Sequence, residues 1–165
     1  AMQNRGSVTV AMADVDHFKN INDTYGHAVG DVVLSELAQR MLRSVRPYDA
    51  VGRYGGEEFL IVFEGCGSAE AVRLAERLRK CVSEEQIQSG EASLSVTISL
   101  GVAVSAPEGE PDHEPIIRRA DAALYLAKKN GRNRAEYAPI SSTNDSSHES
   151  RQSAQEDLPA HPTSK

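Results

Sequence analysis

Two adjacent carboxylates, Glu57 and Glu58, follow a pair of glycines and precede an apolar run that ends at Phe63. A second pair, Asp14 and Asp16, ends a β-branched run near the start of the chain. Carboxylates that are brought close together repel each other unless a cation lies between them. Hard oxygen ligands suit Mg²⁺, which binds one or two carboxylates together with substrate phosphates. The two stretches therefore predict a nucleotide–metal site if the fold brings them together.

The two glutamates lie at the mouth of a predicted β-hairpin, whose strands are Asp49–Tyr54 and Glu57–Phe63. We expect Gly55 and Gly56 to form its two-residue turn, because such turns need residues with φ > 0. The unbroken apolar stretch of the second strand predicts burial on both of its faces. A Gly-Gly turn with solvated acids is common in proteins, so the hairpin alone assigns no function.

Hydrophobic periodicity predicts the remaining elements. A first strand covers Val8–Ala13, and a short helical turn that follows it is broken at Gly26. A strictly alternating strand covers Leu94–Val104, and Arg134–Ala138 is expected to be a short edge strand. Three helices, the second capped by Ser68, have apolar residues on one face: Leu34, Leu37, Ala38, Met41 and Val45 before Pro47; Ala71, Ala75, Leu78 and Val82; Ile117, Ala120, Leu124 and Ala127 before Gly131.

The order strand, helices, hairpin, helix, strand is that of the split βαβ arrangement in ferredoxin-like sheets. We therefore expect an α+β fold of the palm type, with a mixed, mainly antiparallel central sheet flanked by helices. In such a sheet the first strand pairs antiparallel with the second strand of the hairpin. This pairing predicts that Asp14 and Glu57 are neighbours at the edge where the hairpin turns.

Length and composition limit the class of protein. The 165 residues, 39% of them apolar, predict one soluble domain over residues 1–138, and residues 139–165 are expected to be a disordered Ser/Pro-rich tail. A net charge of −6 argues against a nucleic-acid partner. The sequence has no run of 18 consecutive apolar residues, so we expect neither a membrane span nor membrane contact by this domain. Cys66 and Cys81 are expected to be reduced in a cytoplasmic protein, and His17 and His27 to be structural rather than zinc ligands.

The heptapeptide from Arg53 to Phe59 resembles the signature turn of the GGDEF family in its GGEEF form. A second block of that family is similar to Asp14-Val15-Asp16-His17-Phe18-Lys19 together with Asn22-Asp23, Gly26-His27 and Gly30-Asp31. The last block of the family is similar to Lys128 together with Gly131-Arg132-Asn133-Arg134. The resemblance covers Val8 to Tyr137 and implies a nucleotide-cyclase-like fold. Family members are diguanylate cyclases and their degenerate relatives.

The resemblance also implies a role for individual residues. Asp14, Glu57 and the carbonyl of Val15 would bind Mg²⁺ (or Mn²⁺), and Glu58 would assist a second ion or deprotonate the attacking hydroxyl. Guanine would be held by Asn22 and Asp31, and the triphosphate would be neutralised by Lys19, Lys128 and Arg132.

Each assignment has a structural alternative. Asp31 is favourable as an acid near a helix N-terminus, and Asn22 as a turn residue. Lys128 and Arg132 are favourable near a helix C-terminus without any ligand. The joint occurrence of these residues in family order favours the functional interpretation.

The segment Arg46-Pro47-Tyr48-Asp49 matches the RxxD site at which many family members bind their own product. Arginine can stack on guanine and bind phosphate, and aspartate can read the guanine edge. Arg77, on the predicted helix that begins at Ser68, matches a secondary contact. The alternative is a helix end with a proline stop and an aspartate that begins a strand.

The function that the resemblance implies is a diguanylate cyclase, which condenses two GTP molecules into cyclic di-GMP as a homodimer of half-sites and is inhibited by its product. The alternative is a non-catalytic receptor that binds GTP or cyclic di-GMP and signals through protein contacts. A third possibility is a relaxed enzyme that makes mixed cyclic dinucleotides, which Asp31 disfavours. The DxLTGL-type segment that usually opens the domain is absent from the sequence, so we expect an excised domain. Whether the full-length protein is tethered to a membrane stays open.

Overall fold

A five-stranded sheet with the strand order β2-β3-β1-β6-β7 forms the centre of the fold. The structure is a computed structural model that describes residues 7–105 and 113–140. All neighbouring strands of this sheet pair antiparallel except β6 and β7, which are parallel. The strands are β1 (Val8–Val15), β2 (Ala50–Gly55), β3 (Glu58–Glu64), β6 (Ile98–Val104) and β7 (Ala135–Ala138). The expected α+β fold with a mainly antiparallel sheet is confirmed.

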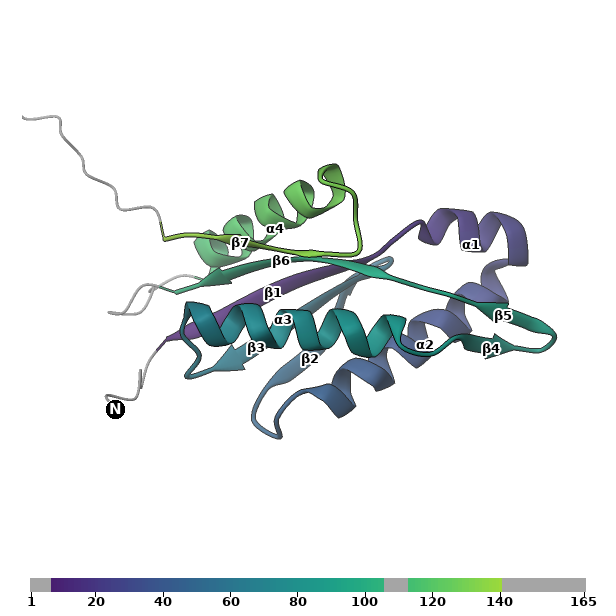
Figure 1. Ribbon diagram of the computed structural model, residues 1–165, viewed down its shortest axis with the longest axis horizontal. Coiled ribbons are helices and arrows are strands. Elements are labelled where there is room, and N and C mark those ends of the chain that lie inside the picture. Colours follow the sequence, from purple (N-terminus) through teal and green to yellow (C-terminus); the bar gives the residue numbers. More distant parts are fainter. Residues whose placement is uncertain (1–6, 106–112, 141–165) are drawn as a thin grey trace, which may run out of the picture.

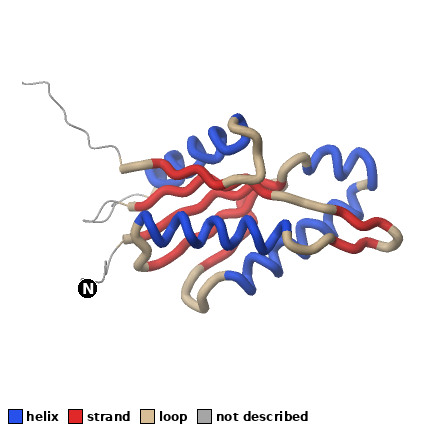
Figure 2. Tube along the Cα trace, in the orientation of Figure 1, coloured by secondary structure: helices blue, strands red, loops and turns tan. Residues whose placement is uncertain are grey.

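Helices cover both faces of the sheet (Figure 1). Helix α4 (Glu114–Lys129) packs on β1, β6 and β7, and α3 (Ser68–Ser83) packs on the opposite face of β6 and β1. Helix α2 (His27–Ser44) lies beside α3 and β2, and the short α1 (Phe18–Tyr25) packs against α2. Beyond the end of the main sheet, β4 (Ile87–Ser89) and β5 (Ala92–Leu94) form a separate small hairpin (Figure 2).

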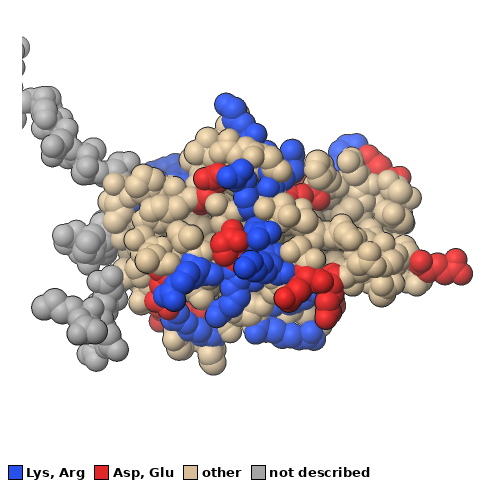
Figure 3. Space-filling model, viewed as in Figure 1, with Lys and Arg blue, Asp and Glu red and all other residues tan. Residues whose placement is uncertain are grey.

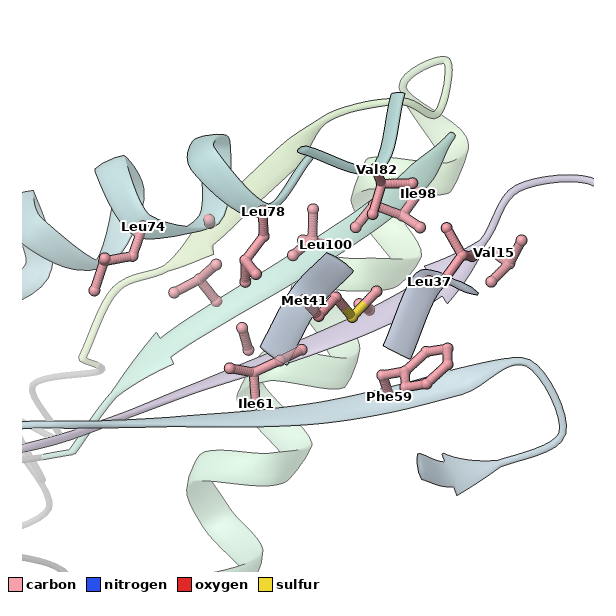
Figure 4. Packing of buried hydrophobic residues seen from close by; sticks show 14 of the residues in the cluster. Val15, Leu37, Met41, Phe59, Ile61, Leu74, Leu78, Val82, Ile98 and Leu100 are labelled. Carbon is pink, nitrogen blue, oxygen red and sulfur yellow. The ribbon is translucent and has the colours of Figure 1, made fainter. Parts of the chain in front are cut away.

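The period-2 alternation of β1 divides the hydrophobic core into two layers. Ala11, Ala13 and Val15 point into the larger layer, beneath α2 and α3, whereas Val10 and Met12 point toward α4. Figure 4 shows how the larger layer interdigitates: Leu37, Met41, Phe59, Ile61, Leu74, Leu78, Val82, Ile98 and Leu100 meet between the helices and the sheet.

The structure corrects the predicted hairpin turn. Neither Gly55 nor Gly56 is among the glycines with positive φ. Arg53 pairs with Phe59 and Gly55 with Glu58, so Tyr54 is an extra residue in the first strand. This bulge lets the chain turn through Gly56 and Glu57 without left-handed backbone. The second strand is not buried on both faces either, since only alternate residues of β3 are buried. Both strands of the hairpin begin and end one residue later than predicted.

The strongest predicted strand is divided in two. Residues 95–97 separate β5 from β6, and all seven residues of β6 are buried. Within β6 the alternation therefore does not mark a solvated face. The small residues Ser99, Gly101 and Ala103 are buried because α4 packs closely on them; a Cβ at Gly101 would lie 2.0 Å from the carbonyl oxygen of Ala120.

Helix boundaries differ from the expectations in smaller ways. Helix α2 begins at His27, directly after the predicted break at Gly26, and it ends at Ser44, one residue before Val45 of the predicted apolar face. Ser68 is the first residue of α3 and makes no capping hydrogen bond. Ile116 rather than Ile117 is fully buried on α4. Cys66 and Cys81 are free cysteines. Within the described ranges, no helix is long and apolar enough to span a bilayer. Most of the predicted 139–165 tail lies outside the described residues.

Candidate active site

Asp14, at the end of β1, lies directly opposite Glu58, the first residue of β3. One residue further along, the backbone N–H of Val15 donates to the carbonyl oxygen of Glu57 at 3.3 Å. The antiparallel register thus brings together the two acidic stretches of the sequence. Glu57 itself belongs to the turn that links β2 and β3, so the residue directly opposite Asp14 is Glu58, and the backbone of Glu57 bonds to Val15, the residue after Asp14.

Asp14 and Glu58 share a partly buried environment on the α4 side of the sheet. Asp14 is 8% exposed, and its Oδ2 pairs with Nζ of Lys128 at 2.8 Å. Partial burial, and next the negative charge of Asp14, raise the pKa of Glu58, whereas the ammonium of Lys128 opposes the shift. The raised pKa of Glu58 reflects the negative charge gathered at this edge, which a further cation would stabilise.

A hollow of about 470 Å³ lies on the other side of the hairpin turn, between α1 and α2. We call it the α1–α2 hollow; its lining residues are Phe18, Lys19, Asn22, His27, Asp31, Leu34, Arg53, Gly56 and Glu57. Four predicted site residues (Lys19, Asn22, Asp31 and Glu57) therefore line one depression. Glu57 reaches this hollow while its neighbour Glu58 faces Asp14, so the turn links the two parts of the site.

Asn22 carries an unused acceptor in this hollow. Its Oδ1 is buried and has no hydrogen-bond partner. The absence of a side chain at Gly30 makes room for it, because a Cβ there would lie 2.0 Å from Oδ1. A buried carbonyl oxygen without a donor is costly, and a ligand that carries an N–H group would satisfy it. Asp31 is exposed on α2, which begins four residues earlier, so the explanation as a first-turn acid does not apply.

The three predicted phosphate ligands are distributed around the same edge. Lys19 is exposed and pairs with Asp23 at 2.7 Å one helical turn later. Lys128 pairs with Asp14. Arg132 is exposed and has φ 62°, in a turn where Gly131 and Asn133 also have positive φ. Arg132 is not among the residues that line the α1–α2 hollow.

The predicted inhibitory segment forms a tight turn between α2 and β2. The N–H of Asp49 donates to the carbonyl of Arg46 at 3.0 Å, and the N–H of Arg46 donates to Oδ2 of Asp49 at 2.9 Å. The guanidinium of Arg46 pairs with Glu70 at the start of α3 and lies 5.8 Å from the centroid of the Tyr48 ring. Asp49 Oδ1 is buried without a partner.

Arg77 is exposed on α3, the same helix that carries the Glu70 partner of Arg46. Lysine and arginine side chains gather over the face that α3 covers (Figure 3), where Arg73, Arg77 and Lys80 are exposed. The chain is acidic overall, but basic side chains gather on this face, with acidic ones among them.

Sequence reasoning left two buried charges without a role. Arg40 is 9% exposed and donates to the carbonyls of Val82 and Glu85 at the end of α3. Its phase with Leu37 and Met41 on α2 is a signal that could have revealed it. Asp16 is 5% exposed and accepts three hydrogen bonds from residues that are far away in the sequence.

The residues at the acidic edge could supply some, but not all, of the ligands of a divalent cation. Within the ranges that the structure describes, no three His, Cys, Asp or Glu side chains are grouped as a metal site. Two carboxylates and a backbone carbonyl nevertheless fit Mg²⁺, which completes its coordination with water and substrate phosphates. The ammonium of Lys128 on Asp14 shows that this carboxylate accepts a positive charge.

The sequence profile of the family described as "Diguanylate cyclase, GGDEF domain" matches residues 1–134. The chain belongs to the GGDEF family. The predicted resemblance is thereby confirmed. The structure adds that the GGDEF signature turn places one glutamate in the hollow and the other opposite Asp14.

Known GGDEF proteins agree with this membership. "Diguanylate cyclase A" of Treponema denticola is 44% identical over 132 residues, which are 80% of this chain and 35% of that protein. The active GGEEF domain of a diguanylate cyclase from Vibrio cholerae has a TM-score of 0.74 at 37% identity, over 83% of this chain and 86% of that one. The GGDEF domain of DgcB from Caulobacter crescentus, in complex with c-di-GMP, has a TM-score of 0.74 at 35% identity, over 80% and 78%. The chain thus spans about a third of the length of the first relative.

Proposed function

We propose that this chain is the catalytic domain of a diguanylate cyclase, which condenses two GTP molecules into cyclic di-GMP and two pyrophosphates. The observation that carries the proposal is the acidic edge of β1 and β3 beside the α1–α2 hollow, in a member of a family whose relatives are named diguanylate cyclases. GTP as the substrate implies a cytoplasmic location for the domain.

Guanine would bind in the α1–α2 hollow. The buried Oδ1 of Asn22 would accept a hydrogen bond from an N–H group of the base, and Asp31 would accept from N1–H and N2–H. Adenine has neither donor at the corresponding edge. Recognition of these donors would leave little affinity for ATP, which argues against a relaxed enzyme.

The triphosphate would lie along the acidic edge, and its charge requires cations there. Asp14, the Val15 carbonyl and Glu57 would hold Mg²⁺ (or Mn²⁺), which supplies positive charge against the phosphate oxygens when bound. Lys19 and Lys128 already have carboxylate partners, Asp23 and Asp14, and would exchange or share them with phosphate oxygens. Arg132 would contribute a further charge from the turn after α4.

The reaction needs a nucleophile that one nucleotide supplies to the other. The 3′-hydroxyl of each GTP would attack the α-phosphorus of the other, so that a new P–O bond forms and the bond to pyrophosphate breaks. Glu58 is suited to accept the hydroxyl proton, because its raised pKa brings it closer to neutrality. One hollow holds one GTP, so two chains must face each other and the working unit is a homodimer.

Product inhibition would use a second site. Arg46, Asp49 and Arg77 would bind cyclic di-GMP on the basic face near α3, as the unpaired Oδ1 of Asp49 and the exposed guanidinium of Arg77 allow. The six residues of β2 separate this segment from the Gly56–Glu57 turn. At about 3.3 Å per residue the two sites are roughly 20 Å apart. Product bound there would act without entering the GTP pocket.

The test is incubation of the protein at high concentration with Mg²⁺ and GTP, alone and together with ATP, followed by chromatographic separation of the nucleotides, with GTP binding measured in parallel by calorimetry. We expect cyclic di-GMP as the product. Tight GTP binding without any product would instead indicate the non-catalytic receptor, and a mixture of cyclic dinucleotides from GTP and ATP would indicate the relaxed enzyme.

A further inference from the structure

Asp16 is a buried acid whose side chain joins three distant segments through hydrogen bonds to neutral donors. Its Oδ1 accepts from the hydroxyl of Ser99 on β6 at 2.7 Å. Its Oδ2 accepts from the hydroxyl of Thr97 at 2.7 Å and from the backbone N–H of Asn133 at 3.0 Å. These bonds compensate for the desolvation of the carboxylate, and they tie the end of β1 to the turn after α4.

Strained backbone is concentrated around this carboxylate. In the described part of the chain, the non-glycine residues with positive φ are His17 at 56°, Arg132 at 62° and Asn133 at 44°. One of them follows Asp16 in sequence, one donates its N–H to it, and the third precedes that donor. Left-handed backbone at a non-glycine residue is unfavourable and persists only where the surroundings enforce it.

The Arg132 turn is held at other points as well. The N–H of Arg132 donates to the carbonyl of Ala127 at 3.0 Å, and Asn133 Oδ1 accepts from Nη1 of Arg79 on α3 at 2.8 Å. These bonds connect the turn to α4 and α3. Among the hydrogen bonds that the structure describes for this turn, the one from Asn133 to Asp16 leads to the end of the strand that carries Asp14.

We propose that Asp16 is a positioning residue, which fixes the strained Arg132 turn relative to the acidic edge so that Arg132 can meet the triphosphate. The role rests on the function proposed above. Asp16 acts through Arg132 and has no contact with substrate. Its loss should therefore weaken the binding of the phosphates while the guanine pocket stays intact.

Two ligands, one with and one without phosphates, distinguish the binding of the phosphates from the binding of guanine. We would measure the binding of α,β-methylene-GTP, whose Pα–C–Pβ linkage cannot release pyrophosphate, and of guanosine, which lacks phosphates. Asp16→Ala should weaken the binding of the triphosphate analogue by about tenfold or more and leave guanosine binding within twofold. Asp16→Asn should be milder, because its oxygen can still accept from Asn133 while the hydroxyl of Ser99 accepts from its amide.

A double-mutant cycle with Arg132→Ala tests the path of the effect. If Asp16 acts through Arg132, Asp16→Ala should cost less than twofold in affinity for the analogue when Arg132 is already alanine. Thr9→Val is the matched control, because it removes another buried hydrogen bond of β1, to the carbonyl of Cys66, away from the site. It should change neither affinity.

Two results would overturn the role. One is a folded Asp16→Ala protein that binds both ligands as tightly as wild type or loses both equally. The other is an undiminished loss in the Arg132→Ala background. If Asp16→Ala does not fold, Asp16→Asn decides by the selectivity of its smaller effect: it should weaken the binding of the triphosphate analogue and leave guanosine binding unchanged, and an equal effect on both ligands, or none, would overturn the role. A wild-type protein that binds neither ligand would contradict the proposed function as well, whereas binding that survives the loss of Asp16 contradicts the positioning role alone.

Discussion

Asp14 and Glu58 lie directly opposite each other where β1 ends and β3 begins, and Lys128 from α4 pairs with the first of them. The register that creates this pair also places the carbonyl of Glu57 on the N–H of Val15. An acidic edge is thus held by the rigid centre of the sheet rather than by a loop. Rigid placement of charged groups favours chemistry on a phosphate, because no reorganisation is needed when the charge of the transition state develops.

The raised pKa of Glu58 predicts a pH-dependent stability in metal-free protein. The folded chain holds this proton more tightly than the unfolded chain, whose pKa is near the ordinary 4.5, so stability falls as pH rises through that value toward the folded pKa. Glu58→Gln should therefore raise Tm at pH 7 and not at pH 4. Thermal unfolding in a chelator measures this, with the exposed Glu64→Gln as control. An equal gain at both pH values would contradict the assignment.

Guanine selectivity depends on Asp31. Competition binding in Mg²⁺ should favour GTP over ATP by tenfold or more, since an unmade hydrogen bond to a charged group costs about 1.5–3 kcal/mol. Asp31→Ala should remove most of this preference, whereas Glu64→Ala, which removes one negative charge at the other end of β3, should leave it unchanged. Equal affinities of the wild-type protein for GTP and ATP would refute the role of Asp31.

Cyclic di-GMP binding at the RxxD segment depends on Arg46. Arg46→Ala should weaken it by about tenfold or more, while Arg43→Ala, which removes an exposed arginine from the last turn of α2, should not. Because Arg46 pairs with Glu70, Glu70→Gln should release the guanidinium and strengthen product binding. Calorimetry with cyclic di-GMP measures all three. Unchanged binding by Arg46→Ala would mean that the segment is only a turn between α2 and β2.

Close packing of α4 on β6 predicts a severe effect at Gly101. A Cβ there would lie 2.0 Å from the carbonyl oxygen of Ala120 and 2.1 Å from the backbone nitrogen of Leu124, so the helix would have to move away. Gly101→Ala should destabilise the domain by about 3 kcal/mol or more. Gly52→Ala is the matched control, because nothing lies within 4 Å of its added Cβ. Denaturant unfolding of both variants compares them; similar midpoints would contradict the packing.

The sequence was sufficient for those features that depend on element order. The pairing of β1 with β3 follows from the split βαβ order, and it correctly brings Asp14 to the hairpin turn. Features set by tertiary contacts were missed. The buried small residues of β6 depend on α4, and nothing local distinguishes Asp16 from a solvated acid, since its three donors come from distant segments.

The hairpin turn shows a different limit. Gly55 and Gly56 indicate a turn correctly, but the expected positive φ is wrong because the bulge at Tyr54 supplies the local twist. Arg40 is in phase with the apolar face of α2 and is buried there. Because arginine is charged, hydrophobicity alone predicts that it is exposed. In both cases the conformation or burial of a residue depends on contacts with a neighbouring strand or helix, which the local sequence does not reveal.

Pyrophosphate release from GTP, measured beside product analysis for wild type and Glu57→Gln, tests the central claim most directly. The wild-type protein with Mg²⁺ should release one pyrophosphate for each GTP consumed and make cyclic di-GMP. Glu57→Gln should remain folded, because Glu57 lies in the turn between β2 and β3 rather than in the core, and should lose turnover by at least about a hundredfold. A wild-type protein that binds GTP and releases no pyrophosphate, or a folded Glu57→Gln protein with unaltered turnover, would contradict the account.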